Sequence, residues 1–275
     1  GEYDKAKKQQ FLALEIAKKI NNPILKAKAY QRLGNIYKFH GDFQISMDYF
    51  FKARDLSYIN KDTVTGVMAD LMIGQSYWKL KKYKEAMVQV EKAERIAIDR
   101  RLSNDVLSPV YLEKGNMLLM LGKLDESLNV YNKVEKLLNT TLHLEGIASL
   151  YSNIGAIYFY KNDFNRAISY YKKSLELAEE YQDKVATGIA KMNIGEALYN
   201  LNQFKKSNII LNESLKLFKG LRDKLMLVDN YNYLYLLETK RNNSKKALAY
   251  FKLKTVYRDS ILNENNLNKI SSLEV

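Results

Sequence analysis

Amide side chains recur at a nearly fixed interval in the first half of this chain of 275 residues. Asn35, Gln75 and Asn116 are separated by 40 and 41 residues. A side-chain amide both donates and accepts hydrogen bonds, so amides at successive heights could hold the N–H and C=O groups of an extended peptide. The chemistry that this spacing indicates is non-covalent recognition.

A second column lies three residues further along the chain and is largely apolar. Its members are Lys38, Trp78, Leu119, Phe159 and Tyr199. Trp78 is the only tryptophan, and with the other rings it could supply apolar pockets for the side chains of a peptide. Aromatic residues at helical spacing more often belong to a core, and that alternative stays open.

Groups that could carry out covalent chemistry are scarce. The chain has no cysteine, which excludes thiolate catalysis, disulfides and cysteine-ligated zinc. Its two histidines, His40 and His143, stand beside an expected turn and an expected helix start, which favours structural roles. The sequence has no glycine-rich phosphate loop, and adjacent carboxylates such as Asp125 and Glu126 point to different sides of a helix. We expect no enzyme activity, no metal and no cofactor.

The elements that must position the amides and rings are repeats. Glycines recur at spacings of 40, 41, 40 and 40, and a small residue follows each of them by twelve positions. A fixed period of this length predicts a solenoid, and apolar residues at steps of three and four on both sides of a short turn predict two helices per repeat. The glycines are Gly34, Gly74, Gly115, Gly155 and Gly195, and the small residues are Ser46, Ala86, Ser127, Ala167 and Ser207.

Two further columns mark the helix ends. The turn between paired helices carries Gly1, Gly41, Lys81, Gly122, Asn162, Asn202 and Asn242. Glycine and asparagine enter the left-handed conformation most cheaply, which a helix C-terminus often requires, and Lys81 is the exception. Helix starts carry Asn22, Asp62, Ser103, His143, Asp183 and Asp223, most of them good N-caps. Ser108-Pro109 offers a second start after Ser103, so we expect an irregular linker there.

The predicted fold is an all-α, right-handed superhelical solenoid over residues 1–262. An orphan second helix at 2–20 precedes six helix pairs, at 24–60, 62–100, 103–140, 143–181, 183–220 and 223–262. Residues 263–275 would begin a C-terminal linker helix or coiled coil. A glycine inside a helix costs about 1 kcal/mol relative to alanine. We expect close packing of the two helices of a pair, at the glycine and the small residue, to offset that cost.

In such a solenoid the first helices crowd on the inside, so the inner face is the natural site for an extended ligand. Asn153 and Asn193 precede their glycines by two positions, and they could contribute to this face or instead tie one repeat to the next. The residues that we predict to line the face are Gln31, Asn35, Lys38, Gln75, Trp78, Asn116, Asn153, Phe159, Asn193 and Tyr199.

These columns resemble the tetratricopeptide repeat, which has a glycine and an aromatic residue in its first helix and a small residue in its second. Gly34 with Tyr37 and Gly74 with Tyr77 match well, whereas Leu118 replaces the aromatic residue. The resemblance covers the whole chain, although the period exceeds the usual length of about 34 residues. It implies a helical module that binds a peptide or protein.

The last residues, Tyr250 to Val275, read YFKLKTVYRDSILNENNLNKISSLEV. They resemble the end of the sensor regions of membrane-anchored regulators from Bacteroidetes-type bacteria. This resemblance implies a signal-transduction role in which a helical linker, a membrane span and a histidine kinase or DNA-binding output domain follow. It also implies an extracytoplasmic location, with a cytoplasmic one as the alternative. Ile261, Leu267, Ile270 and Leu273 are loosely spaced like a coiled-coil seam that could pair two copies.

The formal net charge of +13 raises the question of nucleic acid as a partner. The excess is spread along the whole chain, which favours solvated helix faces over a nucleic-acid groove. We therefore expect a non-catalytic sensor module that binds a peptide or protein and relays the event along its terminal helix. The alternatives are a scaffold that only dimerises a regulator and, less favoured, a nucleic-acid-binding solenoid. Because the chain begins in what looks like the middle of a repeat, we expect it to be part of a longer protein.

Overall fold

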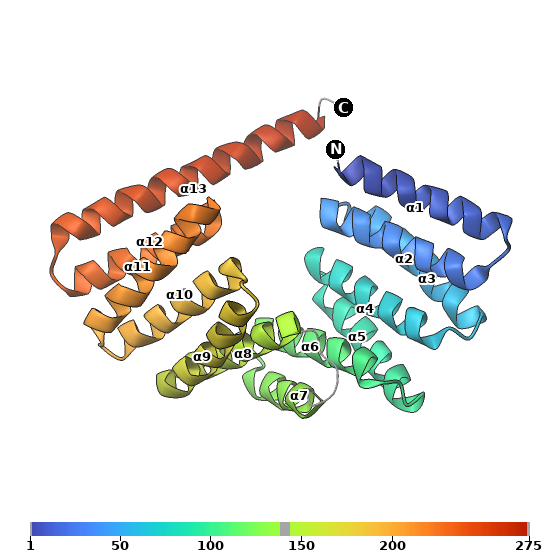
Figure 1. Ribbon diagram of the computed structural model, residues 1–275, viewed down its shortest axis with the longest axis horizontal. Coiled ribbons are helices and arrows are strands. Elements are labelled where there is room, and N and C mark those ends of the chain that lie inside the picture. The colour runs from blue at the N-terminus through green and yellow to red at the C-terminus, as the bar shows by residue number, and fades with distance from the viewer. Residues whose placement is uncertain (1, 138–143, 274–275) are drawn as a thin grey trace. The chain divides into compact units, whose positions relative to one another are not determined.

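The computed structural model describes residues 2–137 and 144–273, and Figure 1 shows their course. These residues form thirteen α-helices and no strand. They are α1 (Glu2–Lys19), α2 (Pro23–His40), α3 (Phe43–Ile59), α4 (Thr63–Lys79), α5 (Tyr83–Asp99), α6 (Asn104–Met120), α7 (Leu124–Leu137), α8 (Leu144–Tyr160), α9 (Phe164–Glu180), α10 (Lys184–Asn200), α11 (Phe204–Leu221), α12 (Lys224–Lys240) and α13 (Ser244–Leu273). The prediction of an all-α solenoid is confirmed.

The helices form two compact units, Gly1–Leu142 and His143–Val275. In the first unit α1 precedes the pairs α2/α3, α4/α5 and α6/α7, and the second unit contains α8/α9, α10/α11 and α12/α13. First helices of neighbouring pairs contact each other, as α2 does α4 and as α8 does α10. Among the described residues, second helices such as α3 and α5 make no equivalent contact. In each unit the first helices therefore form the inner layer and the second helices the outer layer.

The repeated glycine of α2, α4, α6, α8 and α10 lies against a bulky side chain of the second helix. A Cβ atom added to Gly74 would lie 2.9 Å from Val90 Cγ2 and 3.2 Å from the carbonyl oxygen of Ala86. A Cβ atom on Gly155 would lie 2.6 Å from the ring of Tyr171. The expectation of close approach at the glycine is confirmed, and the bulky residue sixteen positions after it is a partner that the repeat columns did not indicate.

The small residue twelve positions after the glycine has a second role where it is serine. The hydroxyl groups of Ser46, Ser127 and Ser207 donate hydrogen bonds to the carbonyl oxygens of the glycines, with distances of 2.7–2.8 Å. All three serines are fully buried. A buried hydroxyl needs such a partner, so this bond allows serine to replace alanine at the closest point of the pair.

An ion pair joins the two helices of one pair in each unit, but the acidic and basic partners are exchanged between the units. The residue four positions before the glycine faces the residue eighteen positions after it. In the first unit the buried carboxylate of Asp70 accepts from Lys92 Nζ at 3.1 Å, and in the second unit Lys191 Nζ donates to Glu213 at 2.8 Å. In two other pairs a lysine lies over a tyrosine ring, Lys133 over Tyr111 and Lys173 over Tyr151.

Most of the predicted helix ends have the expected chemistry. The side chains of Asn22, Asp62, Asp183 and Asp223 accept hydrogen bonds from backbone N–H groups of the first helical turn. Ser103 precedes α6 without such a side-chain bond. The turn residues adopt positive φ, and Lys81 does so too at +61°. Gly1 and His143 lie outside the described residues.

The prediction of an irregular linker at Ser108-Pro109 is wrong. Helix α6 begins after Ser103 and runs through Pro109. The missing N–H of Pro109 removes one bond to the first turn of the helix, and burial of Val106 and Val110 holds the helix together there. Helix α13 continues without a break to Leu273, past the predicted boundary at residue 262. The seam residues after Ile261 lie outside the residues whose side chains the structure describes.

Candidate functional site

A row of polar side chains crosses the inner layer of the first unit. Lys38 Nζ on α2 donates to Gln75 Oε1 on α4 at 2.8 Å, and Gln75 Nε2 donates to Glu113 Oε2 on α6 at 3.0 Å. All three side chains are half-buried. The row therefore links three successive repeats, and we call it the inner polar row.

Burial acts on both charged ends of the inner polar row. It lowers the pKa of the Lys38 ammonium, against the attraction of the Glu113 carboxylate. It also raises the pKa of the Glu113 carboxyl, although the hydrogen bond from Gln75 and the charge of Lys38 oppose the shift. Both groups have lost water that their protein partners do not fully replace. A ligand that brings hydrogen bonds to them would gain from that deficit.

Gln75 is the central member of the row. Its amide uses one oxygen lone pair for Lys38 and one N–H for Glu113. An amide side chain has two lone pairs and two N–H groups, so one of each remains for a ligand. The spacing of the columns correctly brought Lys38 and Gln75 to one face. Glu113 was not among the predicted residues, although it stands two positions before its glycine in the same column as Asn153 and Asn193.

The other polar candidates of the first unit differ in exposure and in how much of their hydrogen-bonding capacity the protein already uses. Asn116 accepts a hydrogen bond from the hydroxyl of Tyr131 at 2.7 Å, so part of its capacity is used within the pair. Asn35 is exposed on α2, and Gln31 is half-buried one turn before it. These two residues extend the polar surface beside Lys38.

The aromatic candidates pack across the turn of their own helix pair. The ring centroids of Trp78 and Tyr83 are 4.7 Å apart, and the rings of Phe159 and Phe164 are 5.3 Å apart. Tyr199 packs in the same way at 5.9 Å from Phe204. Each ring is half-buried at the edge of a core cluster. The geometry favours the core alternative, because these rings hold the turn between the helices.

In the second unit the amides and a carboxylate occupy the inner layer. Asn193 Nδ2 on α10 lies 3.5 Å from Ser152 Oγ on α8, the outer limit of a hydrogen bond, and Asn153 is half-buried beside Ser152. Burial raises the pKa of Glu196, although a hydrogen bond from Tyr233 on α12 opposes the shift. Glu196 stands in the amide column, so its position on this face could be found from the spacing, but its partner could not.

The described residues include His40, which lies at the end of α2. His40 is exposed, stacks on Tyr3 at 4.3 Å and lies 3.0 Å from the carboxylate of Asp42. Within the described ranges, no three histidine, aspartate or glutamate side chains gather as metal ligands would. No helix in those ranges combines the length and the apolar character that crossing a bilayer requires.

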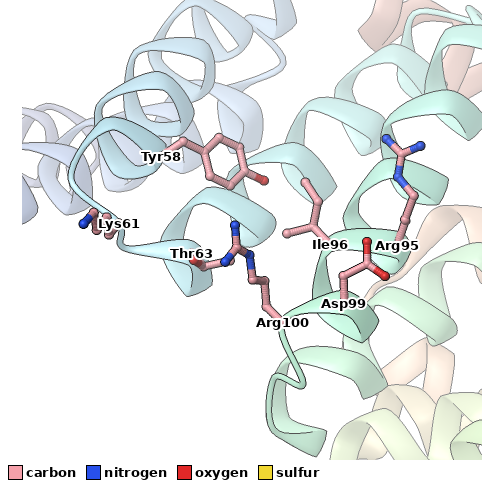
Figure 2. A pocket seen from close by; sticks show the side chains of 7 residues that line it. All are labelled: Tyr58, Lys61, Thr63, Arg95, Ile96, Asp99 and Arg100. Atoms are coloured by element: carbon pink, nitrogen blue, oxygen red, sulfur yellow. The ribbon is translucent and has the colours of Figure 1, made fainter.

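A pocket of about 740 Å³ lies at the outer layer of the first unit, and Figure 2 shows it. It opens between the end of α3, the start of α4 and the end of α5. Tyr58 and Ile96 form apolar parts of its wall, and Arg100 extends from α5 toward the α3–α4 turn. Its lining is Tyr58, Lys61, Thr63, Arg95, Ile96, Asp99 and Arg100, and we call it the basic pocket. No pattern in the sequence indicated this pocket.

The fold and the repeat geometry define a helical-repeat solenoid, and comparisons with known proteins specify it. Tetratricopeptide repeat profiles match residues 27–57, 71–97 and 146–220. No curated protein matches the sequence. The chain therefore contains tetratricopeptide repeats in both of its units.

Solved structures share this fold at low sequence identity. A signal transduction ATPase (STAND) protein with a tetratricopeptide repeat sensor, from Pyrococcus horikoshii, is 20% identical with a TM-score of 0.74, over 88% of this chain and 36% of that one. BtubC from P. vanneervenii is 15% identical with a TM-score of 0.71, over 81% and 93% of the two chains. A Rap protein complexed with competence and sporulation factor is 12% identical with a TM-score of 0.62, over 87% and 76%.

Proposed function

We propose that this chain is a non-catalytic sensor module that binds an extended peptide or protein segment along the inner layer of first helices. The inner polar row carries the proposal. It presents an amide with one unused N–H and one unused lone pair between two half-buried charges, on the first helices of three successive pairs. An extended backbone offers N–H and C=O groups at intervals that such a row could pair with.

Two of the structures with this fold support a sensing role. One is described as a signalling ATPase with a repeat sensor, and the other is a Rap protein in complex with competence and sporulation factor. Tetratricopeptide repeats act as protein-interaction modules, and a solenoid can respond to a ligand because small rotations between repeats add up.

We further propose that the module belongs to a bacterial signal-transduction regulator, either a histidine kinase or a DNA-binding regulator. The resemblance of the residues from Tyr250 onward to the end of such sensor regions supports this. Helix α13, with 30 residues, is the element that would transmit the binding event from the repeats to an output domain. In this proposal the module is extracytoplasmic, with a cytoplasmic location as the alternative.

The test begins with random linear peptides displayed on phage and selected on the immobilised chain. Enriched peptides are then measured by fluorescence polarisation against the wild type, Gln75→Ala and Glu113→Gln. We expect each substitution to weaken binding by about tenfold or more, since central contacts dominate an interface. Gln44→Ala is the matched control, because Gln44 is exposed on the outer helix α3. Unchanged affinity in both inner variants would reject this face.

The aromatic and amide candidates give a second set of variants. Asn116→Ala should weaken the same peptides if their contacts extend along α6 beyond Glu113. Trp78→Ala must be checked for stability first, because Trp78 packs on Tyr83 and its removal would loosen the turn. Equal loss of binding and of helicity in Trp78→Ala would assign that residue to the core.

A second candidate function is dimerisation through the last helix. Helix α13 exposes several large apolar side chains, namely Leu248, Phe251, Val256 and Leu262, each 44–64% exposed. A second copy of the chain could cover them. Light scattering of the wild type and of Val256→Glu/Leu262→Glu would test this, and a monomeric wild type would exclude it.

A further inference from the structure

The basic pocket has a counterpart in the second unit. Comparing the two pockets separates what the repeat geometry produces from what the charged side chains of the basic pocket contribute. A pocket of about 540 Å³ lies at the same place among α9, α10 and α11. Lys216, Leu217 and Leu221 line it at the positions that correspond to Arg95, Ile96 and Arg100. The repeat geometry therefore creates such a pocket in both units, and the side chains differ.

Three cationic side chains and one carboxylate line the basic pocket, a formal net charge of +2. Among the described residues, Lys61, Arg95 and Arg100 have no ion pair within 4.0 Å. In the counterpart pocket, by contrast, Lys191 lies 3.5 Å from Glu179 and 2.8 Å from Glu213. The cations of the second unit are partly neutralised by the protein, whereas those of the basic pocket are not.

Cations at the ends of α3 and α5 have a simpler explanation, because basic residues stabilise helix C-termini. The second unit argues against this as a requirement of the fold. There the residues that correspond to Lys61 and Arg100 are Gln182 and Leu221, and α9 and α11 still end near those positions. Helix α11 carries its own basic residues near its end, Lys219 and Arg222, but at other positions. Helix termination therefore does not require cations at the positions of Lys61 and Arg100.

One wall of the basic pocket, the Tyr58 side chain, is held in place by the protein. The hydroxyl of Tyr58 donates a hydrogen bond of 2.5 Å to the fully buried carboxylate of Asp70, which also pairs with Lys92. The Tyr58 ring packs against Gly66, where an added Cβ would lie 2.6 Å from the ring. A wall that is fixed before binding loses little entropy when a ligand arrives.

We propose that the basic pocket binds a small phosphomonoester. A phosphate of this kind carries a charge of about −1.5 to −2 near neutral pH, which matches the unpaired cations. The guanidinium groups of Arg95 and Arg100 suit phosphate because they donate paired hydrogen bonds. The Tyr58 ring and Ile96 offer an apolar surface to the organic part. This site lies on the outer layer and is independent of peptide binding on the inner layer.

A ligand in the basic pocket would join neighbouring repeats. Lys61 belongs to the turn after α3, and Arg95 and Arg100 belong to α5 and its end. Helices α3 and α5 make no direct backbone contact among the described residues. A phosphate that bonds to both sides would therefore fix the angle between these two repeats.

The test is isothermal titration calorimetry of the purified chain with AMP, ribose 5-phosphate, adenosine and inorganic phosphate at constant ionic strength. We expect at least one phosphomonoester to bind at one site per chain and adenosine not to bind. Arg95→Ala and Arg100→Ala should each weaken that binding about tenfold or more. Lys216→Ala, which changes the residue corresponding to Arg95 in the second unit, should leave it unchanged.

Several outcomes would overturn the proposal. They are no saturable binding of either phosphomonoester, equal binding of adenosine and AMP, or an equal loss in Lys216→Ala and Arg95→Ala. If inorganic phosphate bound as tightly as both esters, the site would be a simple anion site. That result would overturn the proposal that Tyr58 and Ile96 bind the organic group of the ester. Circular dichroism of each variant shows whether the fold is intact, which is expected because Arg95 and Arg100 are exposed.

Discussion

The contact between Gly74 and Val90 allows a test of close helix packing. We expect Gly74→Ala to destabilise the wild type but to stabilise a variant in which Val90 is alanine. In Gly74→Ala the new Cβ would lie 2.9 Å from Val90 Cγ2, whereas ordinary contacts begin near 3.4 Å. The two helices would have to separate by about 0.5 Å, and overpacking of this kind costs about 1–3 kcal/mol. Alanine also gains about 1 kcal/mol of helix propensity over glycine. We expect Gly74→Ala to lower the free energy of unfolding by about 0–2 kcal/mol.

The second substitution removes the atom that the new methyl group meets. Val90 is fully buried, so Val90→Ala alone should cost roughly 2 kcal/mol. In the Val90→Ala background the nearest remaining atom to the added Cβ is the carbonyl oxygen of Ala86 at 3.2 Å. Gly74→Ala should therefore stabilise that background by up to about 1 kcal/mol, since propensity then outweighs crowding.

The assay is urea unfolding followed by far-UV circular dichroism, with the m-value checked for each variant because repeat arrays can unfold in steps. Gly220→Ala is the control. Nothing lies within 4 Å of a Cβ added at Gly220, so this substitution should stabilise the chain. An effect of Gly74→Ala with the same sign and size in both backgrounds would refute the packing argument. Stabilisation by Gly74→Ala in the wild type would refute it as well.

Three further predictions concern charge and backbone conformation. Burial raises the pKa of Glu113 above its usual value of 4.5, so the folded state holds that proton more tightly and stability should fall as the pH rises from about 4.5 through the folded pKa. Glu113→Gln should remove this part of the pH dependence in urea unfolding, and an unchanged pH profile would contradict the assignment. Lys81 has φ of +61°, so Lys81→Gly should raise the unfolding free energy by about 1 kcal/mol. Lys82→Gly, at φ of −89°, should not, and equal effects at the two positions would argue against relief of strain. Asp70→Lys should lower the free energy of unfolding by about 3 kcal/mol or more, because it places a second lysine opposite Lys92. Adding Lys92→Glu, which recreates the charge order of the second unit, should recover much of that loss in the thermal unfolding midpoint. A failure to recover would show that the two orientations of the pair are not interchangeable at this position.

Features that depend on one helix or one pair could be predicted from the sequence. The glycine and small-residue columns predicted the pairing, because close approach requires small residues at fixed places. The N-caps are a further example, since the side chain of Asp62 acts on a backbone N–H only three residues away. Pro109 was misinterpreted because its local preference is outweighed by burial of the apolar residues around it.

Features that join different repeats could not be predicted in the same way. The bond from Lys38 to Gln75 depends on the offset between neighbouring first helices, which the period alone does not specify. The aromatic column was ambiguous because Trp78 faces a ring five residues later, across the turn, as well as lying near the inner layer. The basic pocket combines Tyr58 with Arg95 and Arg100 from two second helices, and no column contains all three.

The reversed ion pairs limit how the repeats could be exchanged. The backbone of each helix pair is much the same, which by itself would let recombination or design shuffle repeats freely. A second helix moved from the α10/α11 pair to the α4/α5 pair would place the carboxylate of Glu213 opposite that of Asp70, which is wholly buried. A second carboxylate facing a buried one would raise the pKa of one carboxyl or open the pair. Grafted or transplanted modules would therefore have to move as intact hairpins, with both partners of each charge kept together.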